Sequence, residues 1–343
     1  MKRARPSFVA TLSAVAVLGA MCMAASCNRN NTSSPNVQQE NPRNTAQNGT
    51  SARPQPTDQA PQNAANSDRV TELAGFDTTT LSTAERDLLW NVANDVLSPC
   101  GDPHSLAVCA RDRLCSSCRP ALRFLSRRVQ DGFDAERLGE LVRARFARDV
   151  VQRINTDGAA IRGNAAASVA LVEFSDYECP HCAAVAPVLR DIEREFGERL
   201  KVVHMHFPLS GHIHAMPASR AAVAAGRQGK FWEYHDLLFA NQSALEPANL
   251  EQYAQRLNLD VARFRADLAG AETENRVAAD RREGERLQID GTPAVYINGR
   301  RWPTALQLDR SQLREWINDE LELAGQAAAP PAGGPSAAAP AAN

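Results

Sequence analysis

The segment between residues 168 and 196 constrains the fold most, because its hydrophobic pattern changes abruptly at Cys179. Residues 168–176, SVALVEFSD, are a short and mostly apolar run, which predicts a buried strand. Residues 180–196, PHCAAVAPVLRDIEREF, place apolar residues at helical spacing. A strand that leads directly into a helix is a unit of α/β folds, so we predict an α/β fold for this part of the chain.

Later segments continue the same plan. They predict a strand at 200–207, helices over about 215–287 with breaks at 226–229, Pro247 and Gly270, two strands within 292–302 joined by a hairpin turn at Asn298-Gly299, and a closing helix at 309–323. The order strand, helix, strand, helices, hairpin and helix is that of an α/β domain, which we place at 155–324 with a helical insertion at about 212–287.

A separate helical unit is predicted at residues 71–153. Its first helix has apolar residues near helical spacing, and Ser82 with Glu85 matches the capping-box pattern. Two further amphipathic helices are expected on either side of a turn at Asp131-Gly132. We therefore expect a small all-α bundle that carries four cysteines, namely Cys100, Cys109, Cys115 and Cys118.

The N-terminus is typical of an export signal. A basic start is followed by an apolar stretch that is too short for a convincing membrane span, and small residues then precede Cys27. This arrangement resembles a bacterial lipoprotein cleavage site, so we predict a signal peptide at 1–27 and lipid attachment at Cys27. Ordinary cleavage that discards Cys27 is the alternative. Both predict export to the periplasm or cell envelope, an oxidising compartment.

Composition separates the folded parts from their flanks. Residues 28–70 are poor in large apolar side chains and predict a disordered linker, and the Ala- and Pro-rich residues 325–343 predict a disordered tail. The chain has 38 Lys and Arg against 40 Asp and Glu, so nucleic acid is not an expected partner. Of eight cysteines, Cys22 and Cys27 belong to the signal region, which leaves an even number for pairing.

The C-x-x-C pair at Cys179 and Cys182 could bind a metal ion, form a structural disulfide or act as a redox centre. Structural zinc usually needs four ligands, and this part of the chain has no further cysteine, so we expect no metal here. A disulfide that closes so short a loop stabilises little. The start of a helix instead exposes backbone N–H groups that stabilise a thiolate. Protonated His181 would add positive charge, and Pro180 suits the first helical turn.

Four segments resemble the DsbA family of exported thiol–disulfide oxidoreductases, which have a thioredoxin-like fold. They are VEFSDYECPHC, HFPLSGHIHA, GKFWEYHDLLFANQ and IDGTPAVYINGR, and the resemblance covers about residues 155–322. It implies a thioredoxin-like domain with an inserted helical subdomain, here preceded by the all-α cysteine-containing bundle.

The resemblance also implies roles for individual residues. Cys179 would be the nucleophile and Cys182 the resolving cysteine. Thr292 and Pro293, with a cis peptide bond between them, would bind substrate beside the pair. Glu173 would be a buried acid that helps to move the proton of Cys182; a solvent-facing strand glutamate is the alternative. No cofactor is expected beyond a redox-active Cys179–Cys182 disulfide.

The role of the four cysteines in the helical unit stays open. Two structural disulfides would suit an exported bundle with little core. A redox relay, in which Cys115 and Cys118 exchange with Cys179, is a second interpretation. RLCSSC with the following helices faintly resembles the CcmH type of cytochrome c maturation factor. Zinc bound by some of these cysteines with His104 is a third.

We therefore expect a protein that donates disulfides to reduced, unfolded exported proteins and is reoxidised by a membrane quinone-linked partner, as the resemblance implies. A reductase or isomerase, perhaps for cytochrome c maturation, and a non-catalytic lipoprotein adaptor are the alternatives.

Overall fold

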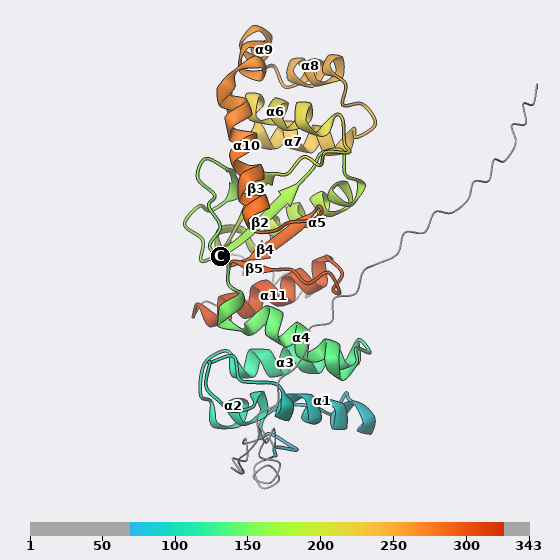
Figure 1. Cartoon of the computed structure of the whole chain (residues 1–343), viewed down its shortest axis with the longest axis vertical. Coiled ribbons are helices and arrows are strands. Elements are labelled where there is room, and N and C mark those ends of the chain that lie inside the picture. Colours follow the sequence, from blue (N-terminus) through green and yellow to red (C-terminus); the bar gives the residue numbers. More distant parts are fainter. Residues whose placement is uncertain (1–68, 326–343) are drawn as a thin grey trace, which may run out of the picture. The chain divides into compact units, whose positions relative to one another are not determined.

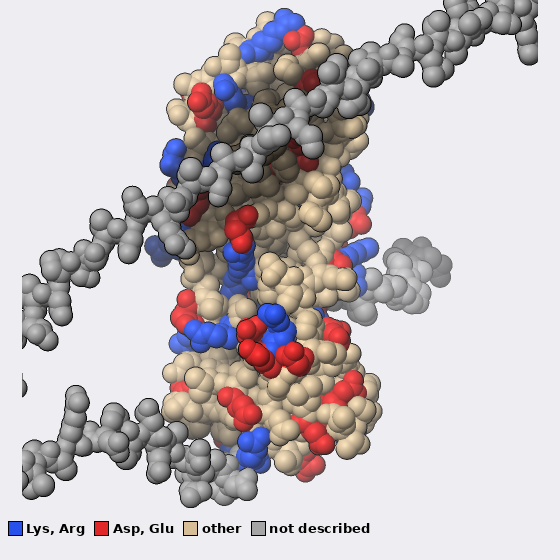
Figure 2. All heavy atoms as spheres, turned by 45° about the vertical axis from the view of Figure 1, so that its right-hand side comes forward, with Lys and Arg blue, Asp and Glu red and all other residues tan. Residues whose placement is uncertain are grey.

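The computed structural model describes residues 69–325, and these belong to one compact unit (Figure 1). The predicted signal peptide with Cys27, almost all of the linker predicted at 28–70 and the tail from residue 326 lie outside the described residues. On the face drawn in Figure 2, acidic and basic side chains are interspersed, in keeping with the near-neutral net charge of −2.

The helical unit contains four α-helices. They are α1 (Thr83–Asp95), α2 (Leu106–Asp112), α3 (Cys118–Gln130) and α4 (Ala135–Phe146), and a short 3-10 helix follows at Arg148–Val150. The capping box at α1 is present, because the Ser82 side chain accepts from the Glu85 N–H and the Glu85 carboxylate accepts from the Ser82 N–H. Helix α2 was not predicted, because its seven residues are too few to show a clear helical period.

A five-stranded mixed sheet forms the centre of the following domain. Its strands are β1 (Ala160–Gly163), β2 (Val169–Ser175), β3 (Leu200–His206), β4 (Ala294–Ile297) and β5 (Arg300–Arg301), in the spatial order β1-β3-β2-β4-β5. Strands β2 and β3 are parallel, and every other pair is antiparallel. Strand β2 is central and almost entirely buried, which explains its nearly continuous apolar sequence.

Seven helices complete this domain within the described residues. Helix α5 (Pro180–Phe196) links β2 to β3, and a 3-10 turn (Gly197–Arg199) follows it. The insertion between β3 and β4 consists of α6 (Ala215–Gly226), α7 (Phe231–Ala240), α8 (Pro247–Arg256), α9 (Val261–Ala269) and α10 (Ala271–Arg286), and α11 (Arg310–Leu323) ends the domain. The insertion has an apolar cluster of its own around Tyr234 and Phe264. The predicted fold class, a thioredoxin-like fold with an inserted helical subdomain after an all-α bundle, is confirmed.

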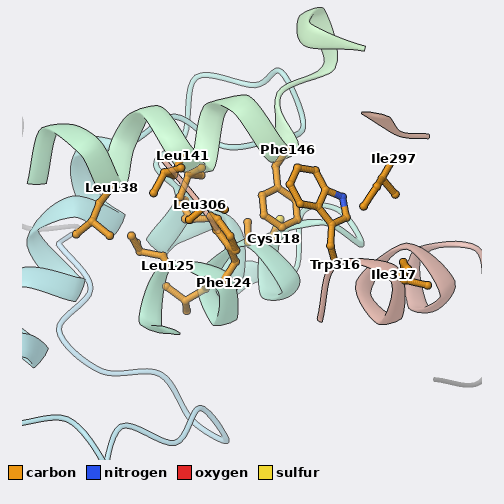
Figure 3. Packing of buried hydrophobic residues seen from close by; sticks show 14 of the residues in the cluster. Cys118, Phe124, Leu125, Leu138, Leu141, Phe146, Ile297, Leu306, Trp316 and Ile317 are labelled. Carbon is orange, nitrogen blue, oxygen red and sulfur yellow. The ribbon is translucent and has the colours of Figure 1, made fainter. Parts of the chain in front are cut away.

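The helical bundle and the sheet domain share one hydrophobic cluster. Figure 3 shows Phe124 and Phe146 of the bundle close to Trp316 of α11, and all three side chains are at least 95% buried. The indole of Trp316 also stacks on Trp302, with ring centroids 5.0 Å apart. The boundary that we predicted near residue 154 therefore separates two parts whose cores are continuous through α11.

Buried ion pairs cross the same boundary. Arg145 of α4 is 2% exposed and donates to Asp319 at 2.5 Å and to Glu315 at 3.2 Å, both on α11. Arg128 of α3 donates to Glu315 at 3.1 Å. A buried charge without a partner is strongly destabilising, so these pairs fix how α3 and α4 dock on α11.

Candidate active site

The C-x-x-C pair lies where β2 leads into α5. Cys179 is the N-cap of α5, Pro180 occupies the first helical position, and the first turn carries no acidic side chain. Cys179 is 4% exposed and Cys182, one turn further along, is fully buried. Both are free cysteines, so the structure describes the reduced form of the pair.

The environment makes Cys179 strongly acidic. The hydrogen bond from the Cys182 thiol lowers the pKa of Cys179 to about 5, with further contributions from the backbone N–H groups of Cys182 and His181. Burial opposes this shift. The backbone N–H groups at the start of α5, including that of His181, thus act on the sulfur as the sequence predicted.

Cys182 has the opposite character. Burial raises the pKa of its thiol far above the ordinary value, and the hydrogen bond to Cys179 and the negative charge of Glu173 add to the increase. The two sulfurs therefore have unlike chemistry: near neutral pH one is a thiolate and the other holds its proton.

A strand edge faces the pair. The peptide bond between Thr292 and Pro293 is cis, as the resemblance implied, and the Cys179 thiol lies 3.3 Å from the Thr292 carbonyl oxygen. The Thr292 hydroxyl is buried and has no hydrogen-bond partner. Strand β4 begins at the next residue, Ala294, so its edge backbone continues directly from the site.

Asp176 holds the loop before α5 in place. This fully buried carboxylate accepts from the N–H of Glu178 at 2.7 Å, from the N–H of Leu209 at 2.8 Å and from Nδ1 of His212 at 2.8 Å. Burial works against the charge on His212, but the Asp176 carboxylate raises the pKa of the imidazole overall. Sequence reasoning missed this contact, although a charged residue directly after a buried strand is a usable signal.

A second positioning contact comes from the insertion. The side-chain amide of Gln242, in the turn after α7, donates at 2.8 Å to the carbonyl oxygens of both Tyr177 and Cys179. This contact fixes the backbone on both sides of Glu178. The sequence held no signal for it, because Gln242 is 63 residues from Cys179.

Glu173 lies in a buried cluster of polar side chains. The carboxylate of Glu173 is 2% exposed on β2, 3.9 Å from Nδ1 of His204 on β3. The solvent-facing alternative for Glu173 is therefore excluded. His235 of α7 lies against His204, with ring centroids 5.0 Å apart, and Nδ1 of His235 is 3.1 Å from an Asp236 oxygen. Burial lowers the pKa of His235 to about 4, so its ring is neutral.

Several atoms of this cluster have no hydrogen-bond partner. They are one oxygen of Glu173, both nitrogens of His204, Nε2 of His235, Nδ1 of His206 and the hydroxyl of Tyr177. Such atoms usually bind buried water or an ion. Glu173, His204 and His235 also lie close enough together to share a metal ion. Cys179 and Cys182 belong to neither of the metal-compatible groups found among residues 69–325.

The four cysteines of the helical unit form a second sulfur-rich site. The disulfides are Cys100–Cys115 and Cys109–Cys118, a pairing that the sequence had left open. His104 lies apart from the sulfurs and contacts Asp102 at 2.9 Å. No helix in the described part of the chain is long and apolar enough to cross a membrane.

Comparisons with known proteins bear on the sheet domain. Residues 155–319 match the family model described as thioredoxin. A Na(+)/H(+) antiporter NhaA 1 of Salinispora arenicola is 42% identical over 154 residues, which are 45% of this chain and 24% of the antiporter. The antiporter NhaA of Herminiimonas arsenicoxydans is 40% identical over 141 residues, or 41% of this chain and 22% of that protein. The chain thus spans about a quarter of these relatives.

Two solved structures are also similar. BdbD from Bacillus subtilis, in its oxidised form, is 22% identical with a TM-score of 0.46 and covers 50% of this chain and 98% of its own. The catalytic domain of Proteus mirabilis ScsC is 22% identical with a TM-score of 0.43 and covers 55% of this chain and 98% of its own.

Proposed function

We propose that this chain, whose residues 155–319 match the thioredoxin family model, is a thiol:disulfide oxidoreductase that introduces disulfides into exported proteins. One observation carries the proposal. The acidic sulfur of Cys179 lies at the start of α5, against the Thr292 carbonyl, with the buried thiol of Cys182 one turn below.

The reaction starts from the oxidised Cys179–Cys182 pair. A substrate thiolate attacks the sulfur of Cys179, forms a mixed disulfide and releases Cys182 as a thiolate, which takes up a proton. A second substrate thiolate then attacks the substrate sulfur of the mixed disulfide, and Cys179 leaves as a thiolate. The substrate gains one disulfide, and the enzyme pair gains two electrons.

The two sulfurs suit these separate tasks. Cys179 is a good leaving group because its thiolate is stabilised, so the last step favours the reduced enzyme and an oxidised substrate. Buried Cys182 does not persist as a thiolate and has to be protonated inside the protein.

Glu173 is the acid that we assign to this proton transfer. Its charge acts on Cys182, and it is shielded from water by the surrounding side chains. The route to solvent that we propose runs from Glu173 past His204 and His235 to Asp236, whose side chain is 32% exposed, and buried water bridges the unpartnered nitrogens of His204 and His235. Arg162 and Arg190 pair with Asp236 at the outer end of this route.

Thr292 and Pro293 form the substrate-binding edge in this proposal. The backbone that leads into β4 passes the reactive sulfur. An extended substrate segment can therefore pair with this backbone while the substrate thiolate reaches Cys179.

The redox-active pair needs no cofactor. The reoxidant is a membrane quinone-linked protein, and Cys27 anchors the chain to the membrane in the periplasm or cell envelope. Antiport is not carried over from the relatives, of which this chain covers about a quarter.

A redox titration tests the proposal. We expect the Cys179–Cys182 pair, in equilibrium with glutathione buffers, to have a potential well above the value of about −270 mV that is typical of thioredoxin. Mixing the oxidised protein with a reduced, unfolded substrate should convert each Cys179–Cys182 disulfide to two thiols and yield one substrate disulfide for each pair that is reduced.

The same experiment separates the alternatives. A potential near that of thioredoxin would replace the oxidase with a reductase or isomerase. A Cys179→Ala variant that keeps full function in the cell would identify a non-catalytic adaptor instead.

A further inference from the structure

The sulfur atoms of the helical unit form a single cluster. Besides its bond to Cys115, the sulfur of Cys100 lies 3.4 Å from that of Cys109 and 3.6 Å from that of Cys118. The sulfurs of Cys115 and Cys118 are also 3.6 Å apart. The two disulfides therefore touch each other, and a second pairing, Cys100–Cys109 with Cys115–Cys118, requires only small movements of the side chains.

The two disulfides differ in their access to solvent. Cys109 is 0% and Cys118 is 1% exposed, whereas Cys100 and Cys115 are only partly buried. A thiolate from solution can reach the outer Cys100–Cys115 bond but not the inner Cys109–Cys118 bond. The inner bond can react only with a sulfur of the outer pair.

The backbone around Cys118 stabilises a thiolate. Cys118 is the first residue of the 13-residue helix α3, and the N-cap residue Ser117 makes no side-chain capping bond. The first turn carries no acidic side chain, and the Cys115 N–H donates to the Cys118 sulfur at 3.3 Å. The helix dipole favours negative charge at this position. Cys179 occupies a similar place at the uncapped start of α5.

We propose that this four-cysteine cluster is a second thiol–disulfide exchange centre, which reacts with protein thiols at Cys115 and passes the exchange inward to Cys109 and Cys118. The proposal does not depend on Cys179 or on the function proposed above. It differs from a pair of structural disulfides because a pair that only cross-links the bundle keeps one fixed pairing.

The exchange is balanced at each step. An incoming thiolate attacks the Cys115 sulfur, forms a mixed disulfide and releases Cys100 as a thiolate. The Cys100 thiolate attacks Cys109, which breaks the inner bond and releases Cys118 as a thiolate. The Cys118 thiolate attacks Cys115 and expels the incoming thiolate unchanged. The pairing has then moved to Cys100–Cys109 and Cys115–Cys118 without net oxidation.

A substrate with two thiols leads to a different end point. Its second thiolate attacks the substrate sulfur of the mixed disulfide and releases Cys115, so that the substrate is oxidised. The cluster is reduced by two electrons, and one disulfide remains among the four cysteines.

The test uses the full chain with Cys22, Cys27, Cys179 and Cys182 each changed to Ser, so that all remaining exchange belongs to the cluster. The oxidised variant is incubated with a trace of reduced glutathione, quenched with acid, alkylated and mapped by mass spectrometry. We expect both pairings, and with a dithiol peptide in excess we expect two alkylated cysteines per chain.

Two further variants in the same background locate the entry point. With Cys100→Ser and Cys115→Ser, the remaining inner disulfide should react with glutathione at least about 100-fold more slowly, because only a buried bond is left. With Cys109→Ser and Cys118→Ser, the outer disulfide should react at the original rate but cannot change its pairing. Circular dichroism checks that both variants are folded.

Three results would overturn the proposal. One is a fixed Cys100–Cys115 and Cys109–Cys118 pairing that resists glutathione and the dithiol peptide, as expected of structural cross-links. Another is equally slow reaction of the outer and inner disulfides. The third is a purified chain with four free thiols and one tightly bound zinc ion in this unit, which would make the cluster a metal site.

Discussion

At the scale of residues, the two cysteines of the C-x-x-C pair differ in acidity. Cys179 is a stabilised thiolate, and Cys182 keeps its proton. The hydrogen bond from Cys182 and the N–H groups at the start of α5 act on Cys179, whereas burial acts on Cys182. The position at a helix start predicted the stabilised thiolate of Cys179, and the family resemblance implied the separate roles of the two cysteines. The motif did not show that Asp176 and Gln242 hold the loop, because their contacts join segments far apart in the sequence.

The acidity of Cys179 makes the free energy of unfolding of the reduced chain depend on pH. The pKa of Cys179 is lowered to about 5 in the folded chain, while a cysteine in the unfolded chain keeps a value of about 8.5. The resulting stabilisation is complete above the unfolded pKa and is lost as the pH falls through the folded pKa. Denaturant unfolding of the reduced chain should therefore give a free energy that rises between pH 5 and about 8.5, by several kcal/mol.

A Cys179→Ser variant provides the control for this pH dependence. It lacks the thiolate, so its free energy of unfolding should rise less over the same range. Parallel curves for the reduced chain and the variant would show that Cys179 has no unusual acidity.

Glu173 can be tested by a change that keeps its shape. Glu173→Gln removes the proton-transferring group near Cys182, so attack on the oxidised pair should slow by about 100-fold, a typical loss for an acid–base group. Stopped-flow kinetics with a thiol peptide at several pH values measures this rate. Glu198→Gln, at an exposed acid in the turn after α5, is the matched control. An unchanged rate and pH profile in Glu173→Gln would remove Glu173 from the mechanism.

At the scale of elements, local signals in the sequence predicted the long helices and central strands. The Ser82 capping box is a clear case, since both of its hydrogen bonds form. Ser82→Ala should lower the free energy of unfolding by about 1 kcal/mol. Ser117→Ala should change it by less than about 0.5 kcal/mol, because Ser117 makes no side-chain capping bond. Equal losses in the two variants would contradict the assigned role of the cap.

Short elements were not predictable in the same way. Strand β1 has four residues with alternating partial burial, and it forms because β3 offers an edge for pairing. Helix α2 has seven residues, and its Cys109 is joined by a disulfide to Cys118 of α3. In both cases the tertiary contacts, rather than a local period, decide the structure.

At the scale of the whole molecule, the bundle and the sheet domain depend on each other through α11. Arg145 is buried against Asp319 and Glu315, and the aromatic rings of both parts share one cluster. Sequence reasoning treated the two parts as separate units, because a contact between α4 and α11 leaves no local pattern in either helix.

Arg145→Met tests this coupling. The change leaves the buried Asp319 without its main partner, so the free energy of unfolding should fall by about 3–5 kcal/mol. A second change, Asp319→Leu, should recover much of the loss, because an apolar pair can replace a buried ion pair. Denaturant unfolding followed separately by the aromatic and far-ultraviolet signals would show whether the two parts unfold together. Additive losses in the double variant would contradict the coupling.

The acidity of Cys179 tests the central claim most directly. In the full reduced chain, the thiolate absorbance at 240 nm, corrected with a Cys179→Ser variant, should titrate with a midpoint near pH 5. A midpoint near the ordinary cysteine value of about 8.5 would contradict the account, because neither the proposed nucleophile nor the oxidising disulfide would then be explained.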